Sequence, residues 1–179
     1  MGLRPGRCYR KPHRPWTRQS RRKPRKGYVK GVPGSKIHQF NVGNILKDYD
    51  KKIFLKSDQD IQIRHNSLEA ARIAAVHYLD TKLGQGNYFL RIRPYPHHVM
   101  RENPLATGAG ADRFQQGMRS SFGKPIGMAA IVKKGQIIME VWLNKDQVDI
   151  GKEAFKRAKY KLPLKYRLLV KDIEKKSVS

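Results

Sequence analysis

The chain has 179 residues, of which 39% are hydrophobic and 30% charged, so it can bury the core of one compact domain. Its 39 Lys and Arg residues exceed its 14 Asp and Glu residues by 25, and such an excess destabilises a folded protein unless an anionic partner offsets the repulsion. The single cysteine, Cys8, excludes an internal disulfide and a cysteine-based zinc site, and no signal peptide or membrane span is recognisable, so we expect a cytoplasmic protein.

Residues 1–31 form a basic arm that holds twelve Lys or Arg residues and four prolines but no acid. Burying unpaired cations is costly, and each proline fixes φ and removes a backbone donor, so we expect an extended arm rather than a helix or a central strand. Three aromatic residues lie among the cations, a pattern that suits a partner with both phosphates and unpaired bases. The candidate RNA-binding residues of the arm are Arg4, Arg7, Tyr9, Arg10, Lys11, Arg14, Trp16, Arg18, Arg21, Arg22, Lys23, Arg25, Lys26, Tyr28 and Lys30.

Two other interpretations of the arm are a solvated tail that only keeps the protein soluble and a segment that binds an anionic membrane surface. The aromatic residues argue against the tail, because disordered segments usually contain few of them. The prolines argue against the membrane, because they prevent the basic amphipathic helix that such a surface would select. RNA is therefore the partner that we expect.

The folded domain is expected over residues 32–172, followed by a polar tail over residues 173–179. Ile37, Phe40 and Val42 are spaced imperfectly for a first strand. Residues 51–65 predict two strands joined by a polar turn at 57–60, which indicates a hairpin. Residues 66–84 predict a helix with Asn66 as its N-cap and Gly84 after its end. The apolar face of this helix should join the core through Leu68, Ala71, Ala75, Leu79 and Leu83.

The second half of the chain continues to mix strands and helices. Residues 87–96 predict a strand with Tyr88, Leu90 and Ile92 on one face and Arg91 and Arg93 on the other. A second hairpin is predicted over residues 127–143, a second helix after Asn144 that ends before Pro163, and a last strand over residues 166–172. Because regular βαβ alternation is missing, we expect an α+β fold with a mainly antiparallel sheet packed with two helices. The helix cations expected to widen the RNA footprint are Lys152, Lys156, Arg157 and Lys159.

The thirty residues 97–126 match no element and are rich in glycine, with four Lys or Arg residues against two acids. Loops longer than about 15 residues are uncommon in compact domains and are usually functional or disordered. We expect a mobile basic finger that reaches into a partner. The candidate RNA- or tRNA-proximal residues of the finger and body are Arg91, Arg93, His97, His98, Arg101, Arg113, Arg119 and Lys124.

Two glycine-rich stretches of the sequence fail as phosphate-binding or dinucleotide-binding motifs. GMRSSFGKP (117–125) lacks the glycine spacing and the Ser or Thr of a phosphate loop, and GAGADR (108–113) lacks the third glycine of a dinucleotide motif. His97 and His98 are adjacent, so on a strand they point to opposite faces, and we expect surface or RNA-contacting histidines rather than a metal pair. No catalytic residue, metal, cofactor or small-molecule substrate is predicted. A free RNA- or DNA-binding chaperone of nucleoid type and an RNA-modifying enzyme remain as alternatives.

Several motifs in register resemble one family. They are GRCYR (6–10), GVPGSKI (31–37), NPLATGAGADR (103–113), GKPIGMAAIVKKGQ (123–136) and EAFKRAKYKLPLKYRLLV (153–170). Together they resemble the archaeal and eukaryotic large-subunit ribosomal protein ten-e, the counterpart of bacterial ribosomal protein sixteen, over nearly the whole chain. The single cysteine and the arm are more similar to the archaeal form.

The resemblance implies a structural, non-catalytic ribosomal protein with an α/β sandwich-like fold. It implies a position among large-subunit ribosomal RNA helices, between the peptidyl transferase region and the central protuberance, facing the aminoacyl-site tRNA and next to other ribosomal proteins. The arm, residues 4–30, would thread into ribosomal RNA, and residues 101–124 would be the tRNA-proximal loop.

Overall fold

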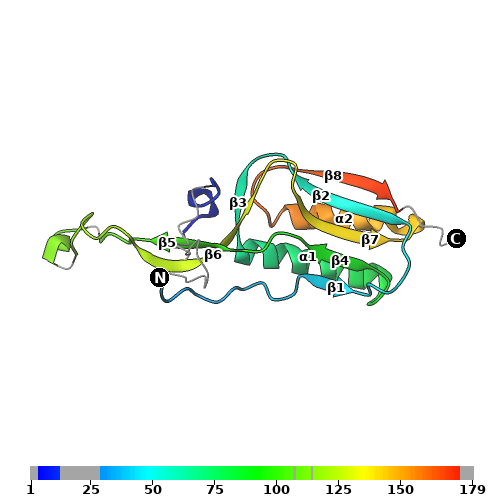
Figure 1. The fold of residues 1–179 in the computed structure, drawn as a ribbon, viewed down its shortest axis with the longest axis horizontal. Helices are drawn as coiled ribbons and strands as arrows, with labels where there is room; N and C mark the ends of the chain where they lie inside the picture. The colour runs from blue at the N-terminus through cyan, green and yellow to red at the C-terminus, as the bar shows by residue number, and fades with distance from the viewer. Residues whose placement is uncertain (1–3, 13–28, 107, 114, 174–179) are drawn as a thin grey trace, which may run out of the picture.

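The computed structural model describes residues 4–12, 29–106, 108–113 and 115–173. Within these residues eight strands form two sheets, and every strand pair is antiparallel (Figure 1). The five-stranded sheet has the order β1 (Asn41–Gly43), β4 (Phe89–Ile92), β7 (Ile137–Leu143), β2 (Lys51–Ser57), β8 (Tyr166–Asp172). The three-stranded sheet has the order β3 (Ile61–Arg64), β6 (Lys124–Val132), β5 (His98–Glu102). The predicted α+β class and the predominance of antiparallel pairing are confirmed.

The two sheets are joined by a bent two-stranded ribbon. One side of the ribbon is the segment β2–β3 and the other is the segment β6–β7. β2 pairs with β7 through Ile53 opposite Val141, and beyond the bend β3 pairs with β6. At the bend the Ser57 N–H donates to the Gln136 carbonyl at 3.0 Å, and the Gly135 N–H donates to the Ser57 carbonyl at 2.7 Å. Both predicted hairpins are therefore wrong. Their strands exist, but the polar turns bend the chain from one sheet into the other instead of reversing it.

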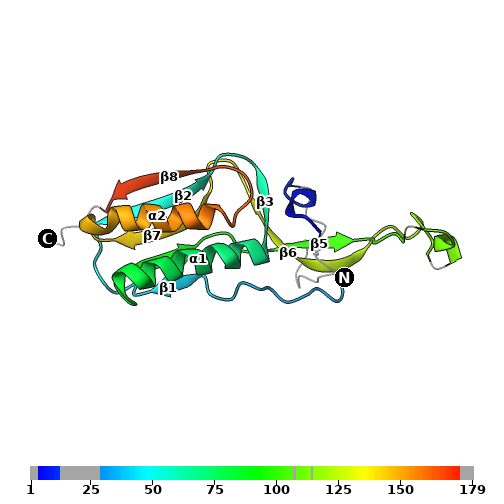
Figure 2. The ribbon, with the colours of Figure 1, turned by 180° about the vertical axis from the view of Figure 1, so that it is seen from behind.

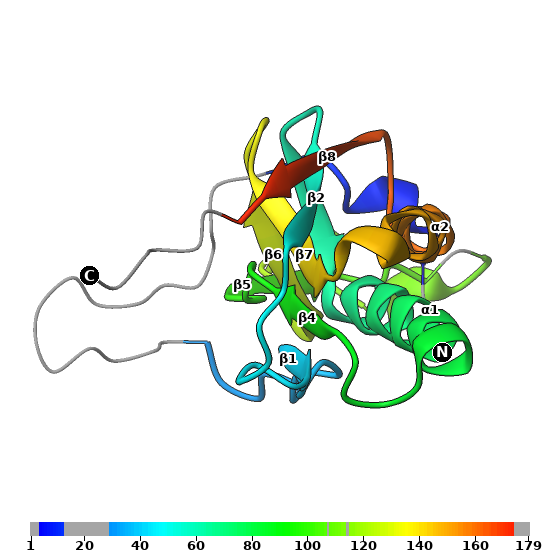
Figure 3. The ribbon, with the colours of Figure 1, turned by 90° about the vertical axis from the view of Figure 1, so that its right-hand side faces the viewer.

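Both helices cover the same face of the five-stranded sheet (Figure 3). The first helix, α1 (His65–Leu83), buries Leu68, Ala71, Ala75 and Leu79 completely, as its apolar spacing predicts. The second helix, α2 (Val148–Lys159), buries Phe155 and packs so closely that a Cβ on Gly151 would come within 2.4 Å of Leu143 Cδ1. The core thus lies between this helical layer and the inner side of the sheet.

The helix ends agree only partly with the predicted caps. α1 begins at His65, with Arg64 in the N-cap position, and the Asn66 side chain accepts a bond from the Ser67 N–H instead of capping the helix. Its other end is as predicted, because Gly84 has a φ of +78° and its N–H donates to the Asp80 carbonyl at 3.0 Å. A 3₁₀ turn at Lys145–Gln147 precedes α2, with Gln147 Oε1 accepting from the Asn144 N–H at 3.4 Å.

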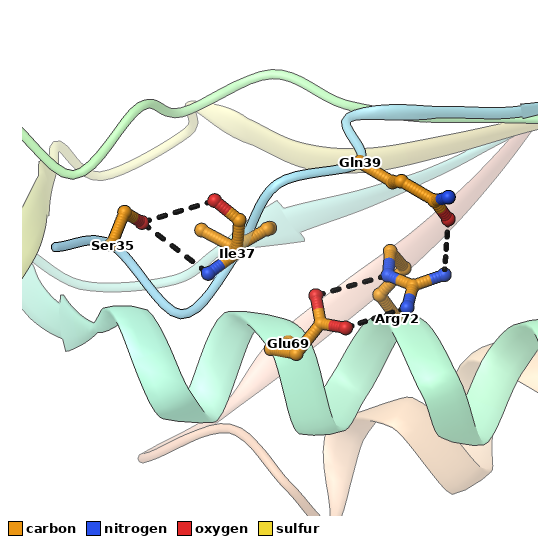
Figure 4. Close-up of polar contacts among 5 residues, drawn as sticks. All are labelled: Ser35, Ile37, Gln39, Glu69 and Arg72. Carbon is orange, nitrogen blue, oxygen red and sulfur yellow. Dashed lines mark hydrogen bonds and ion pairs between the residues drawn. The ribbon is translucent and has the colours of Figure 1, made fainter.

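Residues 29–40 run beside α1 before the chain enters β1. The Ser35 hydroxyl donates to the Ile37 carbonyl at 3.0 Å and accepts from the Ile37 N–H at 3.3 Å (Figure 4). Arg72 of α1 binds both Glu69 of its own helix and, at 3.2 Å, Gln39 Oε1. These bonds hold residues 29–40 in place without strand pairing. The predicted first strand is therefore limited to residues 41–43.

The β5–β6 hairpin projects from the body and carries the loop 103–123 at its far end (Figures 1 and 2). Strands therefore occupy part of the stretch 97–126, which the sequence left without an element. Within the loop the Gln115 side chain bonds both the N–H and the carbonyl of Ala106, at 2.6 and 2.9 Å, and so ties the two limbs together. Gly123 has a φ of +76°, and a Cβ there would lie 2.8 Å from the Glu102 carbonyl carbon, so the limbs close only around a glycine.

Candidate nucleic-acid interface

The first part of the arm, residues 4–12, lies against the three-stranded sheet. Gln62 of β3 donates its N–H to the Arg10 carbonyl at 2.8 Å and its side-chain amide to the Tyr9 carbonyl at 2.9 Å. Arg64 donates to the Arg4 carbonyl at 2.9 Å. A 3₁₀ turn at Gly6–Cys8 lies within this part, so the expectation of a purely extended arm is wrong here.

Glu102, the last residue of β5, holds the same part of the arm. Its carboxylate forms an ion pair with Arg4 and accepts a hydrogen bond from the Tyr9 hydroxyl at 3.1 Å. Burial, and then the bond to the Glu102 carboxylate, raise the pKa of the Tyr9 hydroxyl above its usual range. The acid that the arm lacks is thus supplied from the root of the finger, and Tyr9 stays neutral with only its ring available for a partner.

The two adjacent histidines point to opposite sides, as strand geometry requires. His97 is exposed and its ring lies 4.5 Å from that of Tyr95. His98 is 5% exposed and bonds the Gln62 side chain, so its predicted place on the surface is wrong. Among the described residues no group of three His, Cys, Asp or Glu side chains could hold a metal ion.

The finger separates its cations into two groups. Arg113 and Arg119 are exposed in the loop at the tip. Arg101 is held at the root, where it donates to the Phe122 carbonyl and its guanidinium lies 3.5 Å from the Phe122 ring centroid. Lys124 is exposed at the start of β6. Arg113 and Arg119 lie beyond the ends of both strands, which makes them the part of the finger best placed to reach a separate partner.

The side of the five-stranded sheet that faces away from the helices carries five cations and is called the outer face below. Strand register places Lys52 between Trp142 and Lys171, and Arg91 beside Glu140 in the next row. The Lys52 ammonium lies 4.1 Å from the Trp142 ring centroid, and Phe89 beneath is only 2% exposed. Because its rings are covered, the outer face offers charge rather than stacking surfaces. Its cations are Lys52, Lys56, Arg91, Arg167 and Lys171.

Four of the outer-face cations were missed by the sequence prediction. Their signal is the pair of cations four positions apart in each of KKIFLK (51–56) and YRLLVK (166–171), because residues an even number apart lie on one face of a strand. Arg91, which was predicted, lies among them. Arg93 is tied to Glu140 at 2.9 Å, a pair whose carboxylate is only 2% exposed.

The exposed cations of α2 are largely engaged within the helix. Lys152 pairs with Asp149 at 2.9 Å, and Lys156 pairs with Glu153 at 3.5 Å. The Arg157 guanidinium also lies 4.1 Å from the Tyr78 ring centroid on α1. The charge that this helix can offer to a polyanion is therefore smaller than the sequence suggests.

The remaining predicted residues of the arm fall into two groups: those exposed in the structure and those outside the described residues. Arg7, Arg10, Lys11 and Lys30 are exposed, and the Arg4 side chain is 54% exposed in spite of its ion pair. The other arm predictions lie outside the described residues: Arg14, Trp16, Arg18, Arg21, Arg22, Lys23, Arg25, Lys26 and Tyr28. In the described part of the chain, no helix is long and apolar enough to cross a membrane.

Comparison with known proteins gives one consistent result. The family described as "Ribosomal protein L16p/L10e" matches residues 16–169. A protein of Staphylothermus marinus named large ribosomal subunit protein uL16 is 50% identical over 97% of both chains. Proteins of the same name from Archaeoglobus fulgidus and Sulfolobus acidocaldarius are each 45% identical, over 90% and 100% of this chain and 92% and 99% of theirs. The chain therefore belongs to the ribosomal protein L16p/L10e family.

Proposed function

We propose that the chain is a structural, non-catalytic constituent of the large ribosomal subunit in the cytoplasm. The observation that carries this proposal is the near full-length similarity, at 45–50% identity, to proteins named large ribosomal subunit protein uL16. The net charge of +25 supports it, since ribosomal RNA supplies the stable polyanion that such a charge requires. Neighbouring ribosomal proteins are further partners, and no membrane or small-molecule partner is part of the proposal.

The arm and the outer face are the surfaces proposed to bind large-subunit ribosomal RNA. Exposed cations such as Arg7, Lys11 and Lys171 would neutralise phosphates and release counterions. Aromatic residues of the arm would stack where the RNA is irregular and its bases are unpaired. In this proposal the cations of the outer face contribute mainly to the affinity for RNA, and the arm recognises the shape of the RNA.

The finger is proposed to contact the acceptor arm of the aminoacyl-site tRNA near the peptidyl transferase region. Its support is the projecting hairpin with Arg113 and Arg119 exposed at the tip. Positively charged side chains on a projecting loop can position a phosphate backbone without any chemical role. Peptide-bond formation is assigned to the RNA and not to this chain.

Sedimentation of a native lysate through sucrose gradients at moderate and high salt tests the ribosomal assignment. We expect the chain to co-migrate with large subunits and to remain with them at high salt. A mainly free pool, or binding to double-stranded DNA as tight as to folded RNA, would instead support a free basic chaperone or nucleoid-type protein.

The tRNA role is tested with the double variant Arg113→Ala/Arg119→Ala. We expect large subunits to contain normal amounts of the variant but to bind aminoacyl-site tRNA more weakly, because the lost charges lie at the finger tip. The matched control is Lys161→Ala/Lys165→Ala, which removes two exposed cations from the body. Equal tRNA binding by both variants would contradict the proposed role of the finger.

A further inference from the structure

A cavity of about 400 Å³ lies between the first part of the arm and the root of the finger. Its volume is near the lower end of the range for sites that enclose a small ligand. The wall residues that matter for its chemistry are Cys8, Tyr9, Gln62, Asn103, Ser121 and Phe122. They come from the arm, β3 and both limbs of the finger, so the cavity exists only because the arm is docked.

The cavity combines aromatic walls with amide and hydroxyl groups. Tyr9 and Phe122 supply the rings, and the Arg101 guanidinium lies 3.5 Å from the Phe122 ring centroid. Phe122 is 47% exposed, so its ring retains surface that a flat group could cover. Rings with an arginine plane beside them are the surfaces on which proteins stack single bases.

One wall of the cavity contains a polar group that is not satisfied within the protein. Asn103 Nδ2 is buried and has no hydrogen-bond acceptor among the described residues. A buried donor of this kind costs free energy, and an acceptor on a ligand would recover it once the Asn103 side chain turns this solvent-inaccessible amide toward the cavity. The Gln62 amide, in contrast, is already engaged with the arm and His98.

The charges around the cavity favour a nucleotide over an uncharged ligand. None of its described lining residues is acidic, and the nearby Glu102 is occupied by Arg4 and Tyr9. Exposed Arg7, Arg10 and Lys11 flank Tyr9 in the arm and can hold the phosphates on either side of an inserted base. A bare phosphate would leave the aromatic walls unused.

We propose that this cavity binds one unstacked RNA base, which inserts between the arm and the finger root. The proposal rests on the ribosomal RNA-binding function proposed above and names one contact of that interface. The base would stack on Phe122 or Tyr9, and it would accept a hydrogen bond from Asn103 after that side chain turns toward it. A base from ribosomal RNA or from tRNA would satisfy the same chemistry.

Zero-length ultraviolet crosslinking of assembled large subunits, followed by mass spectrometry of nucleotide–peptide adducts, tests this proposal. We expect adducts on Cys8, Tyr9 or Phe122. In subunits carrying Ser121→Trp, which fills the cavity, the yield should fall roughly tenfold, the factor that loss of one base stack produces. Asn103→Leu, which removes the donor and keeps similar bulk, provides a second variant if Ser121→Trp does not assemble.

The control is Thr81→Trp, which places the same bulk on the exposed last turn of α1 and should leave the yield unchanged. Adducts found on the rest of the arm or on the finger tip, but on none of the three cavity residues, would overturn the base site while leaving ribosomal RNA binding intact. An undiminished yield in the cavity variants would overturn it as well. Failure of the chain to sediment with subunits would instead contradict the proposed function itself. Comparing subunits with and without bound tRNA identifies the source of the base.

Discussion

Gly43 and Gly86 both have a positive φ, of +95° and +86°, but their surroundings differ. A Cβ on Gly43 would lie 2.0 Å from the Tyr88 carbonyl oxygen, whereas a Cβ on Gly86 would meet nothing within 4 Å. We expect Gly86→Ala to lower the free energy of unfolding by about 1–2 kcal/mol through backbone strain alone. Gly43→Ala should lower it further, because the Tyr88 backbone would have to move. Chemical denaturation of the full chain measures both; equal losses would contradict the contact.

His65 predicts a pH dependence of stability. Its buried ring accepts the Lys36 N–H at Nδ1, at 3.2 Å, which requires an unprotonated Nδ1. Burial lowers the pKa of His65, and the charges of Lys36 and Arg64 lower it further. The unfolded state therefore binds more protons, and stability should fall as the pH drops below the unfolded histidine value of about 6.5.

Unfolding of the full chain at pH 7.5 and pH 5.5 measures this effect. His65→Asn keeps an acceptor for the Lys36 N–H but cannot titrate, so its stability should change less between the two pH values. His77→Asn on the exposed side of α1 is the matched control and should behave like the unmodified chain. A His65→Asn variant as pH-sensitive as the control would refute the assignment.

At single positions, the sequence predicts burial well where the spacing of apolar residues in one helix determines it. It predicts burial poorly where a segment from a distant part of the chain covers the residue. The spacing of Leu68, Ala71, Ala75 and Leu79 gave the core face of α1 correctly. His98 was expected at the surface but is covered, because Gln62 and the arm come together over it from remote parts of the chain. No pattern around His98 carries that information.

For the elements, docking of the arm gives a prediction on Glu102, whose carboxylate binds Arg4 and Tyr9. Glu102→Gln removes the ion pair and leaves a carbonyl that can still accept from Tyr9. Exposed ion pairs contribute little because water screens them, so trypsin should cleave after Arg7 only a few-fold faster. Glu153→Gln on α2 is the control and should leave this rate unchanged. Equal rates in both variants would show that Glu102 does not hold the arm.

The extents of most elements were predictable, but their pairing was not. The sequence marks β2, β3, β6, β7 and β8 by alternation and turn residues. It does not distinguish a polar turn that reverses the chain from one that bends it, because both need the same residue types. The choice is made by partners far along the chain, as Ile53 opposite Val141, 88 positions away, illustrates.

For the whole molecule, the outer face predicts how RNA binding depends on salt. Each lysine that contacts a phosphate contributes about 1 to the slope of log affinity against log salt concentration. Lys56→Gln/Lys171→Gln should therefore reduce that slope by up to about 2 for binding to deproteinised large-subunit ribosomal RNA. Lys82→Gln/Lys161→Gln, on the helical side, is the control. Equal slopes for the two variants would remove the outer face from the interface.

The bent ribbon also has a mechanical consequence. β6 carries the finger and continues through residues 133–136 into β7, the central strand of the five-stranded sheet, while bonds from Ser57 brace the bend. Along residues 124–143 only the braced turn 133–136 interrupts strand pairing between the projection and the core. A load applied at the tip is therefore carried as in a cantilever, with its fixed end in the buried strand β7. A push on the finger should tilt the body instead of folding the finger away.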